Sequence, residues 1–469
     1  MNDRPNILWL MTDEQRADSL GAYGSPWAQT PNLDRLAHQG TRFLNAYTPS
    51  PVCVPARASM LTGQAASTTG VLNNHHLLAM DDPPFLTWTL AASGYQVASF
   101  GKHHYQCARK AFDVEGGRTL GDKVHYSGYH VDVDWDECGV IRYEGDTVHN
   151  WLFAGRFPGT VDETPEMENV RQALRWIRRR DPNRPYLLRL SFNAPHTPVV
   201  TPEPYDTMID PESIDLPIDF PDDLDNVPSP VRENFYAQAG TRQFSPEQVR
   251  RTRQCYYGYM ACADHCFGVL LDRLREVGEL DNTIVAFVSD HGCHLGDHAF
   301  YQKQSFYEAS VRVPFFFWGE GVKKGQALET PVSSSSLLPT LLEMVGVEVP
   351  GTVQYRSLAN SLRGGGEPRT VPIFSEVDFG VWDYRDGDRY AMVRDEEWKM
   401  AFFRDPRDAG RFAEDDGLML HNLNDDPGER TNLAGNPQYE EVIQRLMAIL
   451  NTWDRSRETR VPVLREKRR

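Results

Sequence analysis

Asn6-Ile7-Leu8-Trp9-Leu10-Met11 is a short apolar run near the start of the chain, and it predicts a buried β-strand. Four similar runs recur along the sequence, at residues 96–101, 186–192, 283–289 and 313–318. Helical patterns lie between these runs. Strands that alternate with helices indicate an α/β fold, with a large and mostly parallel central sheet flanked by helices.

Several of the helical patterns begin at capping residues. Thr30-Pro31 and Thr164-Pro165 each combine an N-cap residue with a first-turn proline, which predicts a helix start at both places. Ser245-Pro246-Glu247-Gln248 is a capping box. The apolar positions that follow it continue to Val277, and we expect Gly278 to end this longest helix.

The sequence changes in character after residue 363. Gly364-Gly365-Gly366 precedes shorter strand-like and helical stretches, at residues 390–394, 398–403, 418–423 and 439–453. This pattern predicts a smaller α+β unit with an antiparallel sheet. We therefore expect a large domain at residues 1–365 and a C-terminal α+β subdomain at residues 366–469.

The composition excludes some classes of partner. Of the 469 residues, 40% are hydrophobic and 25% are charged, as in ordinary globular proteins, and the formal net charge is -17. A chain this acidic is not expected to bind nucleic acid or an anionic membrane surface. Any bound anion must therefore be held by a local basic pocket.

Cysteine usage and hydropathy bear on the compartment. The seven cysteines are odd in number and lack paired CxxC spacing, which favours a reducing compartment and no structural zinc site. The apolar run at residues 6–11 is too short for a signal peptide, and no run approaches the ~20 apolar residues of a membrane span. We expect a cytoplasmic protein without a membrane anchor.

Cys53-Val54-Pro55-Ala56-Arg57 is the most informative motif, and Leu61-Thr62-Gly63 follows it. Pro55 can serve as the first helical residue, which places Cys53 at a helix start, where free N–H groups and the helix dipole favour negative charge. Arg57 lies one turn later and faces the same way. The arrangement suggests a reactive thiolate that meets an anionic substrate, and the alternative is a buried cysteine beside a helix cap.

Carboxylates follow two of the predicted strands. Asp13 and Glu14 come directly after the first strand, and Asp290 and His291 come directly after the fourth. Such groups can converge on one hard cation, because oxygen-rich sites suit Ca²⁺, Mg²⁺ or Mn²⁺. The alternative for each carboxylate alone is a helix cap or a turn.

The motif at Cys53 and the tripeptide at residues 61–63 resemble the CxPxR signature of type I sulfatases, whose cysteine is oxidised to formylglycine after translation. Residues 422–429 and Asn432-Leu433-Ala434 resemble the C-terminal segment of that family. The resemblance implies an alkaline-phosphatase-like sandwich fold and hydrolysis of a small-molecule or carbohydrate sulfate ester. It also implies a formylglycine-generating enzyme as a maturation partner.

The same resemblance implies a metal site. Asp13, Glu14, Asp290 and His291 match the positions where sulfatases hold a divalent metal, which also contacts the formylglycine at Cys53. This chain departs from the commonest pattern, since Glu14 stands where many relatives have Asp and His291 where many have Asn. A histidine ligand shifts the preference from Ca²⁺ toward Mn²⁺, so both ions stay open.

The remaining catalytic and substrate-binding candidates also rest on the resemblance. Gly101-Lys102-His103-His104 resembles the GKWH box, in which the lysine binds a sulfate oxygen and the last histidine contacts a formylglycine hydroxyl. His196, in a run like PHxP, is the candidate general acid, and its reference pKa near 6.5 suits proton donation near neutrality. Lys303, in a segment like KxxxYExSxRVP, would complete an oxyanion clamp with Arg57 and Lys102. In that segment we expect three residues to shape the loop, namely Tyr307, Glu308 and Arg312.

Two rival functions stay open at this stage. A phosphonate monoester or phosphodiester hydrolase could use the same formylglycine and metal, and Asp290-His291 also occurs in that branch, whereas the Lys102 and His104 box favours a sulfatase. A non-catalytic anion-binding protein is the rival from another class. Side chains that could contact the leaving group lie in long loops, namely Trp135, Trp151 and Phe220. The sequence leaves the oligomeric state open, a homo-oligomer included.

Overall fold

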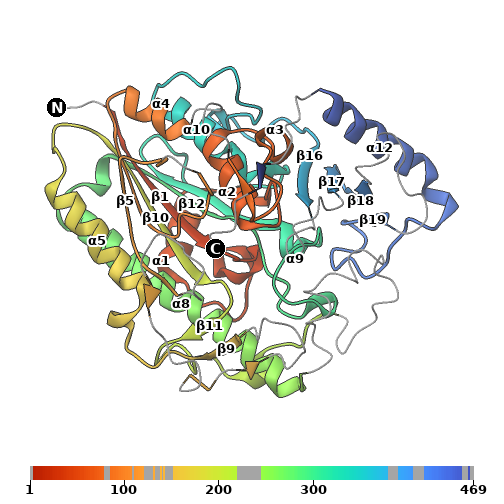
Figure 1. The fold of residues 1–469 in the computed structure, drawn as a ribbon, viewed down its shortest axis with the longest axis horizontal. Helices are drawn as coiled ribbons and strands as arrows, with labels where there is room; N and C mark the ends of the chain where they lie inside the picture. Colours follow the sequence, from red (N-terminus) through yellow and green to blue (C-terminus); the bar gives the residue numbers. More distant parts are fainter. Residues whose placement is uncertain are drawn as a thin grey trace.

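A mixed nine-stranded sheet forms the centre of the protein in the computed structural model (Figure 1). The structure describes residues 4–78, 85–107, 110–120, 130–131, 138–139, 141–142, 152–218, 244–378, 389–404, 417–456 and 463–464. The strand order across the sheet is β14 (Gln326–Leu328), β2 (Thr41–Tyr47), β13 (Arg312–Gly319), β12 (Thr283–Ser289), β1 (Asn6–Asp13), β10 (Tyr186–Pro195), β4 (Gln96–Gly101) and β5 (Val114–Gly116). The short β15 (Val332–Ser333) also pairs with β2.

The middle of the sheet is parallel, as expected. β12, β1, β10, β4 and β5 pair in parallel, whereas β13 runs antiparallel to both β12 and β2. All five predicted strands are present in this sheet. β2 was missed by the sequence analysis because its sequence, TRFLNAY, places partly exposed polar residues between apolar ones and so contains no continuous apolar run.

Two hydrophobic cores cover the two faces of the sheet. Along β1, Leu8 and Leu10 enter one core, and Ile7, Trp9 and Met11 enter the other, as the two-residue period of a strand requires. The first core contains residues of α1 (Pro31–Gln39), α5 (Pro165–Arg179) and α8 (Pro246–Glu276). The second contains residues of α2 (Cys53–Thr62), α4 (Leu86–Ala92) and α10 (Leu337–Met344). Figure 1 shows these two groups of helices on opposite sides of the sheet.

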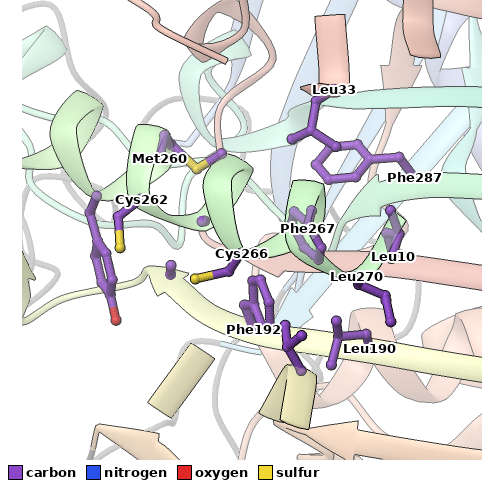
Figure 2. Packing of buried hydrophobic residues seen from close by; sticks show 14 of the residues in the cluster. Leu10, Leu33, Leu190, Phe192, Met260, Cys262, Cys266, Phe267, Leu270 and Phe287 are labelled. Carbon is purple, nitrogen blue, oxygen red and sulfur yellow. The ribbon is translucent and has the colours of Figure 1, made fainter. Parts of the chain in front are cut away.

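The long helix α8 packs tightly on the sheet. Phe267 of α8 stacks on Phe192 of β10, with ring centroids 4.2 Å apart, and meets Phe287 of β12 edge-on (Figure 2). Leu270, one turn further along, points toward Leu10 and Leu190 in the same view. This packing holds β1, β10 and β12 together as the rigid base beneath the carboxyl ends of the strands.

The predicted helix starts are confirmed with one difference. Thr164 accepts a hydrogen bond from the Met167 amide, and Ser245 forms the expected capping box with Gln248. Thr30 precedes α1, but its hydroxyl donates to Asp34 and does not cap the helix backbone. Asp264 of α8 caps α1 instead, since its carboxylate accepts from the Asn32 and Leu33 amides.

A second, antiparallel sheet follows near the C-terminus, as predicted. Its order is β16 (Ile373–Asp378), β17 (Arg389–Asp395), β18 (Trp398–Arg404) and β19 (Met419–Asn422), and α12 (Glu440–Arg455) covers one face of it. The other face packs against the main unit through Tyr390 and Met392, which join a core with Tyr47 and Phe306. In Figure 1 this subdomain lies beside the central sheet, with α9 (Glu308–Val311) between the two.

Among the helices of the described ranges, none combines the length and the apolar character that crossing a bilayer requires.

Candidate active site

The candidate residues come from the carboxyl ends of four neighbouring strands. Asp13 ends β1, Asp290 follows β12, His196 follows β10 and Lys102 follows β4, and these strands are adjacent in the order β12-β1-β10-β4. In a parallel sheet such ends meet at one edge, where open α/β folds bind ligands. The structure therefore brings together residues that are 277 positions apart in the chain, as Asp13 and Asp290 are.

The two carboxylate turns are locked to each other. The Glu14 amide donates to Asp290 Oδ1 at 3.1 Å, and the Gln15 amide donates to the Ser289 hydroxyl at 3.0 Å. Glu14 has a φ of 63°, a left-handed conformation that is uncommon outside glycine. This turn directs the Glu14 side chain into the site, where it is fully buried.

Cys53 is the first residue of α2. Val52 is the N-cap, so Pro55 is the third helical residue. The sequence analysis had assumed that Pro55 is the first. Gly63 ends the helix with a φ of 67° and donates its N–H to Ser59. Asn74 accepts a hydrogen bond from the Val54 amide at 3.0 Å. The helix start is thus buried, and its dipole points at the Cys53 side chain.

The Cys53 sulfur lies at the centre of the cluster. Sγ is 3.1 Å from His291 Nε2, 3.4 Å from Lys303 Nζ and 3.8 Å from Asp13 Oδ1. Its neighbours come from three different elements, β1, the turn after β12 and the loop before α9. A buried cysteine beside an ordinary helix cap would not require two cationic or imidazole groups at contact distance.

Arg57 ties the carboxylates together. Its guanidinium donates to Asp290 at 2.7 Å, to Asp13 at 2.8 Å, and to the Lys102 carbonyl and the Ser191 hydroxyl at 2.9 and 3.0 Å. The side chain is 1% exposed. The sequence analysis expected Arg57 to face the substrate anion. In the structure its guanidinium instead points to the two aspartates.

Lys102 and Lys303 reach the cluster from different elements, since Lys102 follows β4 and Lys303 precedes α9. Lys102 Nζ is 2.6 Å from Asp13 Oδ2, and Lys303 Nζ is 2.9 Å from Glu14 Oε2 and 2.7 Å from His196 Nε2. The Lys102 backbone depends on Gly101, whose φ is 99° and where a Cβ would lie 1.9 Å from the Ser191 carbonyl. Burial alone would raise the pKa of Asp13, but Lys102, His196 and Arg57 hold it well below its usual value.

The three histidines differ in their electrostatic environment. Burial lowers the pKa of His196 well below its usual value, and Lys102 and Lys303 lower it further. Burial and then Lys102 lower the pKa of His104 in the same way. Burial also acts to lower the pKa of His291, but Asp290 and Cys53 raise it to about 9. The expectation that His196 has a near-neutral pKa suited to proton donation is therefore not met.

The cluster offers ligand atoms for a metal ion. One atom each from Asp13, Cys53, Asp290 and His291 lie within 4.8 Å of one another, as do atoms from Asp13, Glu14 and His196. Glu14 Oε1 is buried and lacks a hydrogen-bond partner in the described structure, which a cation would supply. Carboxylate oxygens with one imidazole suit a divalent cation such as Ca²⁺ or Mn²⁺, so the residues present fit the expected group.

The sequence analysis missed several supporting residues. Ser191 and Arg189 of β10 both contact the Lys102 backbone region, and Thr48 donates to the Asp290 carbonyl at 2.5 Å. Arg189 is buried over the Trp9 ring, with its guanidinium carbon 5.0 Å from the ring centroid. A charged residue inside the apolar run 186–192 was the available signal for Arg189, whereas nothing in the sequence marks Thr48 or Ser191.

Further ionisable residues lie outside the cluster. Asp297 forms ion pairs with Arg16 and Arg253, and His294 contacts the Ser305 hydroxyl. Both residues therefore belong to a buried network that supports the loop between β12 and α9. His76 lies 3.9 Å from Asp378 of β16. The aromatic residues considered for the leaving group fall outside the described residues, namely Trp135, Trp151 and Phe220.

Comparisons with known proteins agree with this geometry. The family model described as Sulfatase matches residues 5–347, and the model described as N-sulphoglucosamine sulphohydrolase, C-terminal, matches residues 296–456. An arylsulfatase of Clostridium perfringens is 28% identical over 470 residues, which cover 95% of this chain and 94% of the relative.

Two solved structures share the fold along nearly the whole chain. BT4656 in complex with its substrate D-glucosamine-2-N,6-O-disulfate has a TM-score of 0.78 and 22% identity, with 97% of this chain and 98% of that chain covered. The phosphonate monoester hydrolase of Silicibacter pomeroyi has a TM-score of 0.79 and 25% identity, with 98% and 96% covered.

The fold is that of the alkaline-phosphatase-like superfamily. Within that superfamily, the chain belongs to the sulfatase family, since the family model spans residues 5–347. The protein is therefore a sulfuric ester hydrolase.

Proposed function

We propose that this sulfatase hydrolyses sulfate monoesters with a formylglycine made from Cys53 and one divalent metal ion. The observation that carries the proposal is the position of Cys53 Sγ, which lies 3.1 Å from His291, 3.4 Å from Lys303 and 3.8 Å from Asp13. Sγ stands where the formylglycine oxygens would be. When hydrated, formylglycine supplies one hydroxyl for attack on sulfur and a second for release of sulfate.

The metal would be held by Asp13, Asp290 and His291, with Glu14 as a further ligand. Bound there, it would supply positive charge for the sulfuryl oxygens and lower the pKa of a neighbouring hydroxyl. Arg57 keeps Asp13 and Asp290 at a fixed separation, because its guanidinium contacts both carboxylates. We therefore assign Arg57 to positioning the ligands and leave charge stabilisation to the two lysines.

Lys102 and Lys303 would bind the sulfuryl oxygens and stabilise the charge that develops on them. For the leaving alcohol we propose His196 as proton donor together with Lys303, whose ammonium is 2.7 Å from Nε2. Burial and the lysines disfavour the imidazolium, so a neutral His196 would draw the proton that it donates from the Lys303 ammonium beside Nε2. His104 would accept the proton of the second hydroxyl when sulfate is released.

The substrate is proposed as a carbohydrate or small-molecule sulfate. A fold neighbour binds a sulfated glucosamine as its substrate, which favours the carbohydrate class. Phosphonate monoesters are the second candidate, because the Asp290-His291 pair beside Cys53 resembles that branch and a phosphonate monoester hydrolase shares the fold. The presence of Lys102 and His104 beside the site favours the sulfate ester.

Two measurements test the proposal. Peptide mass spectrometry of protein from its native host should find residue 53 lighter than cysteine by the fixed mass of the formylglycine conversion. Converted, metal-supplied enzyme should then show a larger kcat/KM for an aryl sulfate than for a phenylphosphonate monoester. A residue 53 that stays a thiol in the native host would refute the proposal, and a larger kcat/KM for the phosphonate would favour the second candidate.

Further proposals concern the protein's context. Conversion of Cys53 requires a formylglycine-generating enzyme, and we propose one as the maturation partner. The odd number of cysteines without CxxC spacing supports a cytoplasmic location. We also propose residues 1–365 as the catalytic domain and residues 366–469 as the C-terminal subdomain.

A further inference from the structure

The loop that carries Lys303 leads directly into the C-terminal subdomain. Lys303 precedes α9 by five residues, and α9 begins at Glu308. Glu308 contacts two residues of the C-terminal subdomain, Lys399 of β18 and Glu429, which follows β19. We call these three residues, Glu308, Lys399 and Glu429, the loop clamp.

The loop clamp is an ionic cluster in which Lys399 and Glu429 are buried and Glu308 is partly buried. Lys399 Nζ is 2.8 Å from Glu308 Oε1 and 2.5 Å from Glu429 Oε1. The other oxygen of Glu429 accepts a hydrogen bond from the Glu308 amide at 2.6 Å, so the subdomain also holds the first backbone N–H of α9. The side chains of Lys399 and Glu429 are each 2% exposed. In this environment the ion pairs are only weakly screened by solvent.

Aromatic contacts reinforce the connection on both sides of the loop. Phe306 packs against Tyr390 of β17 with centroids 4.6 Å apart, and Tyr307 stacks on His298 at 3.9 Å. The Tyr47 hydroxyl donates to Glu308 Oε2 at 3.1 Å. The segment between Lys303 and α9 is therefore held by the C-terminal sheet and not only by its own domain.

The backbone at Lys303 requires such support. Gln302 and Gln304, on either side of Lys303, have φ values of 63° and 71°, which non-glycine residues rarely adopt. Conformations of this kind persist only where the surrounding structure imposes them. On the N-terminal side the Gln302 carbonyl accepts from the His294 amide at 2.6 Å. On the C-terminal side the loop clamp is the ionic anchor that follows Lys303.

We propose that the loop clamp is a positioning device for Lys303, through which the C-terminal subdomain influences the rate of the reaction. The inference rests on the role proposed for Lys303. Its physical basis is the sensitivity of catalysis to placement, since an error of about 1 Å in a catalytic group can cost about 10²-fold in rate. Lys303 Nζ contacts Glu14, His196 and Cys53 at once, so a shifted loop would lose several contacts together.

The test uses the full-length, converted and metal-supplied enzyme with an aryl sulfate as substrate. Lys399→Met should lower kcat/KM by about 10²-fold. It should also raise the inhibition constant of inorganic sulfate, because the anion loses a correctly placed Lys303. Lys399→Arg keeps the charge and should restore most of the activity. Glu429→Gln keeps an acceptor for the Glu308 amide and should show a smaller loss in the same direction.

Arg445→Met is the matched control. Arg445 of α12 pairs with Asp395 on the same subdomain, but it contacts no part of the Lys303 loop in the described structure. Its removal should leave kcat/KM and sulfate inhibition within about twofold of the wild type, as expected for an exposed ion pair. Melting temperatures of all variants separate lost stability from lost positioning.

A double-mutant cycle distinguishes the inference from the proposed function. In a Lys303→Ala background, Lys399→Met should cost little further kcat/KM, because its effect passes through Lys303. Additive losses would overturn the loop clamp as a positioning device. So would wild-type kinetics in Lys399→Met, or, if that variant does not fold, in Glu429→Gln. If Lys303→Ala itself keeps full activity, the role proposed for Lys303 fails instead.

Discussion

The protein buries charged side chains in two places, the reaction centre around Cys53 and the loop clamp. The two places differ in how completely these charges are paired. In the loop clamp, Lys399 lies between Glu308 and Glu429, and Arg312 Nε, 3.3 Å from Glu308, supplies the positive charge that balances the second carboxylate. At the reaction centre, Lys303 contacts a carboxylate, an imidazole and a sulfur atom, and Glu14 Oε1 lacks a hydrogen-bond partner in the described structure. The reaction centre keeps donor and acceptor atoms for groups that come from outside.

The comparison shows that buried charge does not by itself identify a catalytic site. Both clusters contain lysines and glutamates that are almost fully buried. They differ in location, because the reaction centre lies at the carboxyl ends of adjacent parallel strands, whereas the loop clamp lies between an antiparallel sheet and a short helix. Convergence of ligand atoms on one point is the distinguishing property.

Removal of the residue that becomes the nucleophile should have the largest effect on turnover, and it tests the reaction centre alone. Cys53→Ala should abolish turnover and leave the melting temperature close to that of the wild type, because alanine fits the buried helix start. Steady-state assays and thermal unfolding check both expectations. Cys266→Ala, at a buried residue of α8 in the first core, is the matched control and should retain kcat. Measurable turnover by fully purified Cys53→Ala would contradict the proposed nucleophile.

Lys303→Ala should have the next largest effect. The loss of one charge-stabilising donor at a developing oxyanion costs about 10²- to 10³-fold in kcat. The melting temperature should change little by comparison. Lys323→Ala, at an exposed lysine, should be kinetically silent. A large drop in melting temperature with little change in kcat/KM would show that Lys303 is structural and belongs with the loop clamp.

His291→Asn tests the chemistry of the metal site. Replacing an imidazole by an amide oxygen should favour Ca²⁺ over Mn²⁺, and we expect the ratio of the two affinities to change by about tenfold, or about 1.4 kcal/mol. Calorimetric titration of the metal-free protein measures the affinities independently of turnover. Unchanged affinities for both ions would mean that His291 is not a ligand and contacts only residue 53.

Leu446→Ala should have the smallest effect on catalysis. Leu446 lies on α12 in the core of the C-terminal sheet, on the face away from the reaction centre. The substitution should lower the free energy of unfolding by about 2–5 kcal/mol, as for other buried leucines, and leave kcat within about twofold. Denaturant unfolding and steady-state assays check this, with Leu446→Met as control. A large loss of kcat would show that the core of the C-terminal sheet, and not only the loop clamp, positions Lys303.

Much of the fold could be predicted from local patterns. The strand at residues 283–289 and the capping box at Ser245 appear where the sequence places them, because continuous apolar runs and capping side chains act over a few residues. β2 and β16 were missed because their sequences mix polar and apolar residues. β2 becomes a strand by pairing with the distant β13, and β16 by pairing with the next strand, β17. Asp264 replaced Thr30 as the cap of α1 for the same reason, because it lies 231 residues from Leu33.

The sequence by itself determined the residue types of the reaction centre, because CxPxR and the carboxylates after two strands are local signals. Tertiary structure alone decided their arrangement. Arg57 donates hydrogen bonds to Asp13 and Asp290, and Glu14 accepts one from Lys303. Lys399 of the C-terminal sheet forms an ion pair with Glu308, which follows the loop of Lys303. The physical reason is that a buried charge has a high desolvation cost unless an opposite charge lies beside it. Which opposite charge lies beside it depends on how distant segments of the chain pack.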